Sequence, residues 1–130
     1  MNALHRCATA ALVALSFVGA AHAQAPRKFT QYTLRGAIVF GDYPQISLNG
    51  QLTRLAPGGR VRNLDNLVVS AATLAGLSAV VNYTLDLGGN QVRDVWILRP
   101  EEVAVTPWPT TPDQARTWTF NLVDQTWTQP

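Results

Sequence analysis

Residues 79–98 read AVVNYTLDLGGNQVRDVWIL, and this stretch decides the fold class. Two runs rich in β-branched and aromatic residues flank Gly88-Gly89, which is typical of antiparallel strands joined by a two-residue turn. Such a turn needs positive φ, which glycine tolerates best. In the predicted register Leu85 faces Val92, and apolar groups lie on both faces near the open end. We therefore expect this hairpin to be central in a closed or layered β-structure.

Short strands separated by turn residues precede this hairpin. Residues 29–40 alternate, which predicts a strand with Tyr32 and Leu34 on its apolar face. A second hairpin is centred on Asn49-Gly50. A two-residue loop would place Ile46 opposite Thr53 and mix polar and apolar residues on each face. We therefore favour a three-residue bulged loop, which pairs Ile46 with Leu52 and keeps one face apolar.

The sequence Ala56-Pro57-Gly58-Gly59 predicts a type II turn between two strands. Six or seven short strands follow one another at close spacing, with no long helical period. Residues 29–98 therefore indicate an all-β domain, a small OB-like or SH3-like antiparallel barrel.

Residues 99–130 form a tail rich in proline and tryptophan. Pro100 could begin a short helix, and a second one is predicted from Pro112 to near Thr117, capped by Thr111. Two short strands in residues 117–128 predict a possible hairpin. The tail is too aromatic to be disordered, and we expect it to pack on the barrel.

Residues 1–23 have the features of a secretory signal peptide: a positive start, an apolar run and the sequence Ala21-His22-Ala23. Cleavage after Ala23 removes every histidine, cysteine and methionine of the chain. The mature chain then has no Cys/His metal site, no disulfide and no catalytic Ser-His or Cys-His pair. We expect a periplasmic or secreted protein without a metal or cofactor and without a transmembrane segment after cleavage.

The formal net charge is +2, and it falls to +1 when Arg6 leaves with the signal peptide. A charge so close to zero gives no attraction toward nucleic acid or anionic lipid. Nucleic acid is therefore not an expected partner.

Four pieces of the chain carry a family resemblance: LRGAIVF, LNGQLTRLAPGGRVRN, VNYTLDLGGNQVRDVWIL and PWPTTPDQARTWTF with QTWTQP. In order and spacing they resemble a group of small, uncharacterised signal-peptide-bearing proteins of Gram-negative bacteria. The resemblance covers nearly the whole mature chain. It implies a single periplasmic or secreted domain, and it implies no activity, ligand or site residue.

The tail tryptophans Trp108, Trp118 and Trp127 are candidate binding residues, because exposed rings could stack on sugar rings or on a peptide. The alternative is that they cover one open end of the barrel. Trp108 lies between two prolines, and we expect it to be the most exposed of the three.

Arg54, Arg60 and Arg62 surround the predicted turn and are candidate ligands for a phosphate, a carboxylate or an acidic glycan. Arg35 or Arg93 could join them across the sheet. The alternative is a solvated rim without a function.

A hydrolase of the glycosidase kind needs two carboxylates across a cleft. In the predicted register Asp86 and Asp94 lie on opposite faces, so no catalytic residues are expected.

The sequence favours a non-catalytic exported domain that interacts with an unknown envelope protein or has a structural role, using the tail or a barrel edge. The first alternative is a binding module for cell-wall glycan or another anionic envelope ligand. The second is a hydrolase that uses carboxylates alone.

Overall fold

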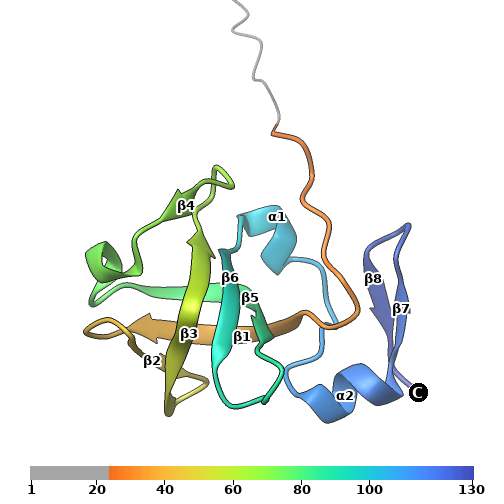
Figure 1. Ribbon diagram of the computed structural model, residues 1–130. Coiled ribbons are helices and arrows are strands. Elements are labelled where there is room, and N and C mark those ends of the chain that lie inside the picture. The colour runs from red at the N-terminus through yellow and green to blue at the C-terminus, as the bar shows by residue number, and fades with distance from the viewer. Residues whose placement is uncertain (1–23) are drawn as a thin grey trace, which may run out of the picture.

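Eight strands and three short helical segments follow one another in residues 24–130, the part of the chain that this computed structural model describes (Figure 1). The predicted signal peptide lies outside the described residues. The elements are β1 (Leu34–Phe40), β2 (Gln45–Leu48), β3 (Gln51–Arg62), β4 (Val68–Val69), the 3-10 helix η1 (Ala71–Leu74), β5 (Ser78–Leu85), β6 (Val92–Ile97), α1 (Pro100–Val103), α2 (Pro112–Thr117), β7 (Thr119–Asn121) and β8 (Thr126–Thr128).

Five strands close into a barrel. The sheet order is β2-β1-β5-β6-β3-β4, and a further pairing of β2 with β3 joins its two sides. The predicted small all-β barrel is confirmed, and one of its pairs, β3 with β6, is parallel where we expected only antiparallel pairs. This strand order with one parallel pair is that of the OB-type barrel. β4 extends the sheet by pairing with the end of β3.

The barrel interior is filled by alternate residues of the strands, as the period of two requires. In β1 the core positions Leu34, Ile38 and Phe40 are buried, while Ala37 and Val39 face outward. The other buried apolar residues of this core are Ile46, Leu55, Val61, Val81, Tyr83, Val92 and Val95.

The β5–β6 hairpin forms as predicted, but its loop and register differ. Leu85 pairs with Val92 as expected, whereas a register shift beyond this pair places Val81 opposite Ile97. The predicted two-residue turn is wrong, because the backbone N–H of Asp86 donates to the carbonyl of Gln91 and the loop spans the four residues between them. The Asp86 carboxylate also accepts hydrogen bonds from two backbone N–H groups of that loop, which stabilises the longer form.

The β2–β3 hairpin has the two-residue loop that we disfavoured. Ile46 pairs with Thr53 and Ser47 pairs with Leu52, so the bulged register is wrong. Asn49 and Gly50 both have positive φ, 52° and 81°, which suits a primed turn. The local preference of this dipeptide outweighs the gain of one fully apolar face, and Leu52 remains 88% exposed.

β3 does not end at the predicted type II turn. It continues through Pro57-Gly58-Gly59 as one strand of 12 residues, and its register with β6 shifts between Leu55 and Arg60. Gly58 takes the positive φ expected of it, 75°, but within a bulge rather than a turn. A bulge bends a strand, and this bend lets β3 pair first with β2 and then with β6.

The tail has the predicted short helix and hairpin. The Thr111 side chain accepts a hydrogen bond from the backbone N–H of Gln114, and α2 ends at Thr117 as expected. β7 and β8 pair with Phe120 opposite Trp127. Four buried residues, Phe29, Leu98, Trp108 and Trp127, form a second core beside the barrel.

Candidate functional site: a groove between barrel and tail

A groove of about 990 Å³ lies where the tail meets the barrel. The β5–β6 loop and the tail elements α2, β7 and β8 all contribute to its lining. Figure 1 shows α2 beside the β5–β6 loop, with the β7–β8 hairpin beyond it. We call this groove the junction groove. Its lining comes from residues 30–32 before β1 and from Leu34 at its start, from residues 84–87 at the end of β5 and in the loop after it, from residues 93–94 of β6, and from residues of the tail between α2 and β8. A volume of this size is within the range of small-molecule sites, about 300–1,000 Å³.

Aromatic rings form much of the groove wall. Tyr32 from the barrel side and Trp118, Phe120 and Trp127 from the tail all line it. Tyr32 is 72% exposed, because a turn closed by Thr33 N–H donating to the Thr30 carbonyl delays the start of β1. The prediction that Tyr32 joins the apolar face of β1 is therefore wrong. An exposed ring and the half-buried Trp118 give a ligand flat faces to pack against.

Trp108 is part of the second core. It is 6% exposed, and its indole N–H donates to the Thr33 carbonyl at 2.9 Å. The guanidinium of Arg35 lies 4.9 Å from the centre of its ring, and Phe29 meets it edge to face. The expectation that Trp108 is the most exposed tail tryptophan is wrong, since the ring fits between β1 and the tail.

Trp127 belongs to both the second core and the groove. It is 4% exposed, and its ring lies 4.8 Å from that of Phe120. Its Nε1 is buried and has no acceptor among residues 24–130. An unpaired buried donor costs free energy, so this N–H is an unsatisfied donor inside the second core.

The three candidate arginines of β3 do not form one cluster. Arg54 lies opposite Gln45 of β2, whereas Arg60 and Arg62 lie opposite Asp94 and Trp96 of β6. The bulge in β3 separates the two groups. Arg54 is not among the groove-lining residues, although the next residue, Leu55, pairs with Val92 of β6.

Arg62 and Arg93 both lie against Asp94. Arg62 Nη1 is 3.6 Å from Asp94 Oδ1, and Arg93 Nε is 3.9 Å from Oδ2. Arg62 also packs over the ring of Trp96, 5.4 Å from its centre. Arg93 and Asp94 line the junction groove, so the exposed β3–β6 face continues into it. Of the two arginines expected to join those of β3, Arg93 lies beside Arg62 at Asp94.

Arg35 lies elsewhere. Its guanidinium donates to the carbonyls of Glu102 and Val105 and to the side chain of Asn82. Burial lowers the pKa of Arg35, and the charge of Glu102 opposes that effect. Arg35 therefore ties β1 to the segment after α1 and takes no part in the groove.

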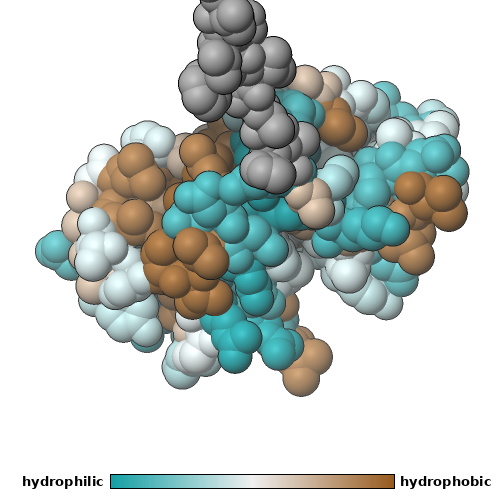
Figure 2. Space-filling model, turned by 90° about the horizontal axis from the view of Figure 1, so that it is seen from above, coloured by the Kyte–Doolittle hydropathy of each residue, from teal (hydrophilic) through white to brown (hydrophobic). Residues whose placement is uncertain are grey.

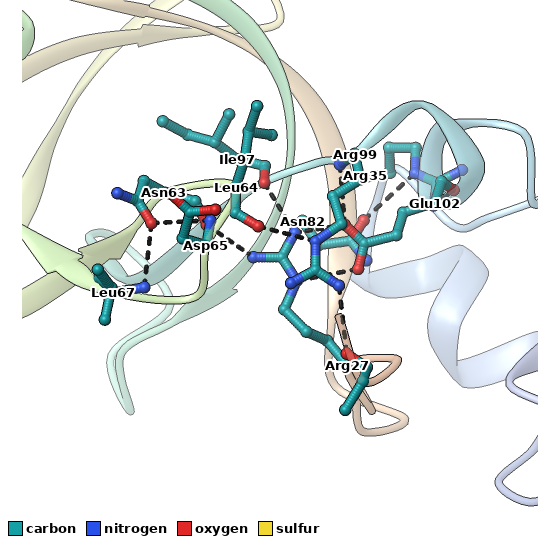
Figure 3. A network of polar contacts seen from close by, with 11 residues as sticks. Arg27, Arg35, Asn63, Leu64, Asp65, Leu67, Asn82, Ile97, Arg99 and Glu102 are labelled. Carbon is teal, nitrogen blue, oxygen red and sulfur yellow. Dashed lines mark hydrogen bonds and ion pairs between the residues drawn. The ribbon is translucent and has the colours of Figure 1, made fainter. Parts of the chain in front are cut away.

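Figure 3 shows Arg27, Arg35 and Arg99 gathered about Glu102. Arg27 pairs with the Glu102 carboxylate and donates to the carbonyls of Asn63 and Ile97. Arg99 donates its backbone N–H to Glu102 Oε1 at 2.8 Å and its side chain to the carbonyls of Leu64 and Ala25. These donors are used by the protein itself, so the hollow of about 430 Å³ beside them is a structural junction.

Glu102 is held in its charged form. Burial raises the pKa of Glu102, but hydrogen bonds from Arg27 and the Arg99 backbone, with the charges of both guanidiniums, lower it by more. The net effect is a pKa below the usual value of 4.5.

Among residues 24–130, no group of three or more histidine, cysteine, aspartate or glutamate side chains is arranged to hold a metal ion. Asp86 and Asp94 both line the groove, although the predicted register placed them on opposite faces. The shift in the β5–β6 register is the reason. The Asp86 carboxylate holds its own loop, and Asp94 accepts a hydrogen bond from Thr84 Oγ1 at 3.3 Å.

Apolar surface outside the groove is divided. Seen from the end that carries β4, one apolar patch lies over β4 and another over the β7–β8 turn, with hydrophilic surface between them (Figure 2). The first includes Leu64, Leu67 and Val68, and the second Leu122 and Val123.

Sequence reasoning identified Trp118 and Trp127 among the groove residues and missed Tyr32, Phe120 and Arg116. Trp118, the extended residue at the C-cap of α2, and Phe120 of β7 are two positions apart, which places both rings on one face of an extended chain, and this signal was available. The contribution of Tyr32 depends on how the tail packs on the barrel, which local patterns do not show.

No family model, no curated protein and no solved structure matches this chain. In residues 24–130, no helix is long and apolar enough to cross a membrane.

Proposed function

We propose that this protein is a non-catalytic binding module of the bacterial envelope, and that a sugar chain lies in the junction groove. The observation that carries the proposal is the groove itself, in which the rings of Tyr32 and Trp118 stand beside charged groups of Arg93, Asp94 and Arg116. Ring faces bind the apolar faces of sugars, and charged side chains accept and donate hydrogen bonds to hydroxyl groups.

The location in the fold supports the same proposal by analogy. OB-type barrels bind oligosaccharides and oligonucleotides on the face of their second and third strands and beside two loops, one of which joins the last two strands. The β5–β6 loop is the equivalent here and contributes Asp86 and Leu87 to the groove. Fold analogy alone does not assign a function, so the groove lining carries the argument.

The geometry favours a groove ligand over a docked protein. A protein interface needs a continuous surface of about 800 Å² on each partner with an apolar centre. The exposed apolar residues near β4 and those at the β7–β8 turn lie in separate patches (Figure 2). The envelope location follows from the signal peptide predicted at residues 1–23.

Co-sedimentation with purified peptidoglycan sacculi tests the proposal. Trp118→Ala removes a groove ring, and Leu122→Ala removes an exposed apolar side chain of the same tail outside the groove. We expect the wild type and Leu122→Ala to sediment alike, and Trp118→Ala to lose about tenfold in affinity, from the ~1–1.5 kcal/mol of one stacked ring. Equal sedimentation of all three proteins, or none of the wild type, would contradict the proposal. Circular dichroism confirms that each variant is folded.

A further inference from the structure

We propose that the sugar chain bound in the junction groove is acidic, and that its carboxylate or phosphate group is recognised by Arg93 and Arg60 on the β3–β6 face. The inference rests on the proposed function. It adds the charge of the ligand and the side of the groove on which that charge lies.

The charges of the groove lining balance one another. The lining contains two arginines, Arg93 and Arg116, and two aspartates, Asp86 and Asp94. Arg116 also pairs with Asp113 on the same helix, and both of these side chains are exposed. The tail side of the groove therefore has no excess of positive charge, and it presents mainly aromatic rings.

The β3 side carries the excess. Asp94 is the acid against which Arg62 and Arg93 both lie, at 3.6 and 3.9 Å. Arg60 lies opposite Asp94 in the register of the parallel pair and is exposed. Two arginines thus pair with one carboxylate and Arg60 adds a third positive charge beside them, so the surface between β3 and β6 has two positive charges in excess.

Hydrogen-bond donors at this face are unused. Arg62 Nη1 is buried and makes no hydrogen bond to any group of residues 24–130, since its distance to Asp94 is that of an ion pair. The Arg93 side chain is 65% exposed, so its guanidinium is open to solvent. Guanidinium groups bind carboxylate and phosphate oxygens in a bidentate manner.

These features define the order of the contacts. A sugar ring lies against Trp118 and Tyr32 in the groove, and an acidic substituent on it or on the next sugar reaches Arg93 at the groove edge. Arg60 lies further along the same face and meets the next acidic group of a repeating chain. A neutral sugar chain would use the rings and hydrogen bonds to its hydroxyl groups, without a contact between opposite charges.

Isothermal titration calorimetry with three soluble glycans tests the inference. The neutral probe is the hexamer of N-acetylglucosamine. The carboxylate probe is peptidoglycan glycan strands from which the peptides have been removed, and the phosphate probe is lipid-free lipopolysaccharide core oligosaccharide. The variants are Arg93→Gln and Arg60→Gln, and the matched control is Arg54→Gln, an exposed arginine of β3 opposite β2.

We expect an acidic glycan to bind at least tenfold more tightly than the neutral hexamer. Arg93→Gln should lower the acidic affinity about tenfold, the worth of one charge-assisted hydrogen bond, and lower the neutral affinity by much less, because glutamine can still hydrogen-bond a sugar hydroxyl. Arg60→Gln should act in the same direction with a smaller loss, and Arg54→Gln should change neither affinity. Raising the salt to about 0.5 M should weaken only the acidic ligand.

The outcomes separate the two proposals. A preference for the carboxylate probe alone identifies peptidoglycan as the source, and a preference for the phosphate probe alone identifies lipopolysaccharide. Equal affinity for neutral and acidic glycans, or an Arg93→Gln effect no larger than that of Arg54→Gln, overturns the inference and leaves the sugar-binding groove standing. If Trp118→Ala changes the binding of no glycan, or no glycan binds, the proposed function fails as well.

Discussion

Replacing Glu102 by glutamine should destabilise the protein more than any other single change of a carboxylate. The carboxylate receives hydrogen bonds from Arg27 and from the backbone N–H of Arg99. The Arg27 side chain is 4% exposed and that of Glu102 is 12% exposed, so the ion pair is almost dry. Glutamine keeps the shape and removes the charge, which leaves a buried guanidinium without its counterion.

The magnitude follows from the remaining partners of Arg27. Removing one member of a buried ion pair costs about 3–5 kcal/mol. Arg27 retains the carbonyls of Asn63 and Ile97 as acceptors. We therefore expect the lower end, a loss of about 3 kcal/mol in the free energy of unfolding, measured by urea titration with tryptophan fluorescence at pH 7. The total stability of such a domain is about 5–15 kcal/mol, so the loss is large.

The difference between the wild type and Glu102→Gln should also depend on pH. The pKa of Glu102 lies below its usual value of 4.5 in the folded protein. A carboxyl group with a lowered folded-state pKa stabilises the fold above the pKa that it has when unfolded, and this contribution disappears as pH falls through the folded value. We expect a constant difference at neutral pH that shrinks in acid below the usual Glu range.

Glu101 supplies the control. It is the neighbouring residue of the same helix and is exposed. Glu101→Gln should change the free energy of unfolding by less than about 0.5 kcal/mol. If Glu102→Gln costs no more than Glu101→Gln, or if its cost stays the same down to the lowest pH at which the wild type folds, the buried ion pair does not have the role we assign to it.

Three further predictions test the packing by the same urea titration. Trp108→Ala should cost about 3–5 kcal/mol, because the ring is buried in the second core; a loss below 1 kcal/mol would contradict the burial. Ile46→Ala should lower the free energy of unfolding by about 2–5 kcal/mol and Leu52→Ala by less than about 0.5 kcal/mol. In the observed register the two side chains lie on opposite faces, so that Ile46 is buried and Leu52 is exposed. Similar losses for the two variants would favour the bulged hairpin. Gly59→Ala should destabilise the protein by at least about 1 kcal/mol, since its Cβ would meet backbone oxygens at 2.8 and 2.9 Å. Gly88→Ala is the control, because a Cβ there meets only one atom, at 3.8 Å. Equal effects of the two substitutions would show that β3 does not pass so close to β6.

The sequence was sufficient to predict the class of fold, because alternation and turn residues are local signals. The Thr111 cap and the proline after it predicted α2 to its last residue, and the central hairpin was correctly centred on Gly88-Gly89. The errors concern register and loop length. A one-residue shift in an otherwise correct hairpin reverses the faces of its side chains, and this error separated Asp86 from Asp94, which line one groove.

The candidate site was only partly predictable for a different reason. Trp118 was identified from its residue type, but the groove exists only because residues far apart in the chain meet. Tyr32 and Trp118 are 86 positions apart (118 − 32), and both line it. The prediction of a type II turn at Pro57-Gly58 was wrong for the same reason. The conformation there depends on long-range pairing, because β3 pairs with two different strands and this favours a bulge.

The second core determines the shape of the groove as well as the stability of the tail. Ala115 of α2 packs against both the barrel core and the second core, so the helix is fixed between them. Trp127 lies in the second core and lines the groove, and it pairs with Phe120 across the β7–β8 hairpin. Because both cores fix this wall of the groove, it is ordered before a ligand binds, which reduces the entropic cost of binding. A substitution that loosens the second core, such as Trp108→Ala, should therefore weaken glycan binding without touching the groove lining, whereas Trp118→Ala should weaken binding and leave the stability of the barrel largely intact.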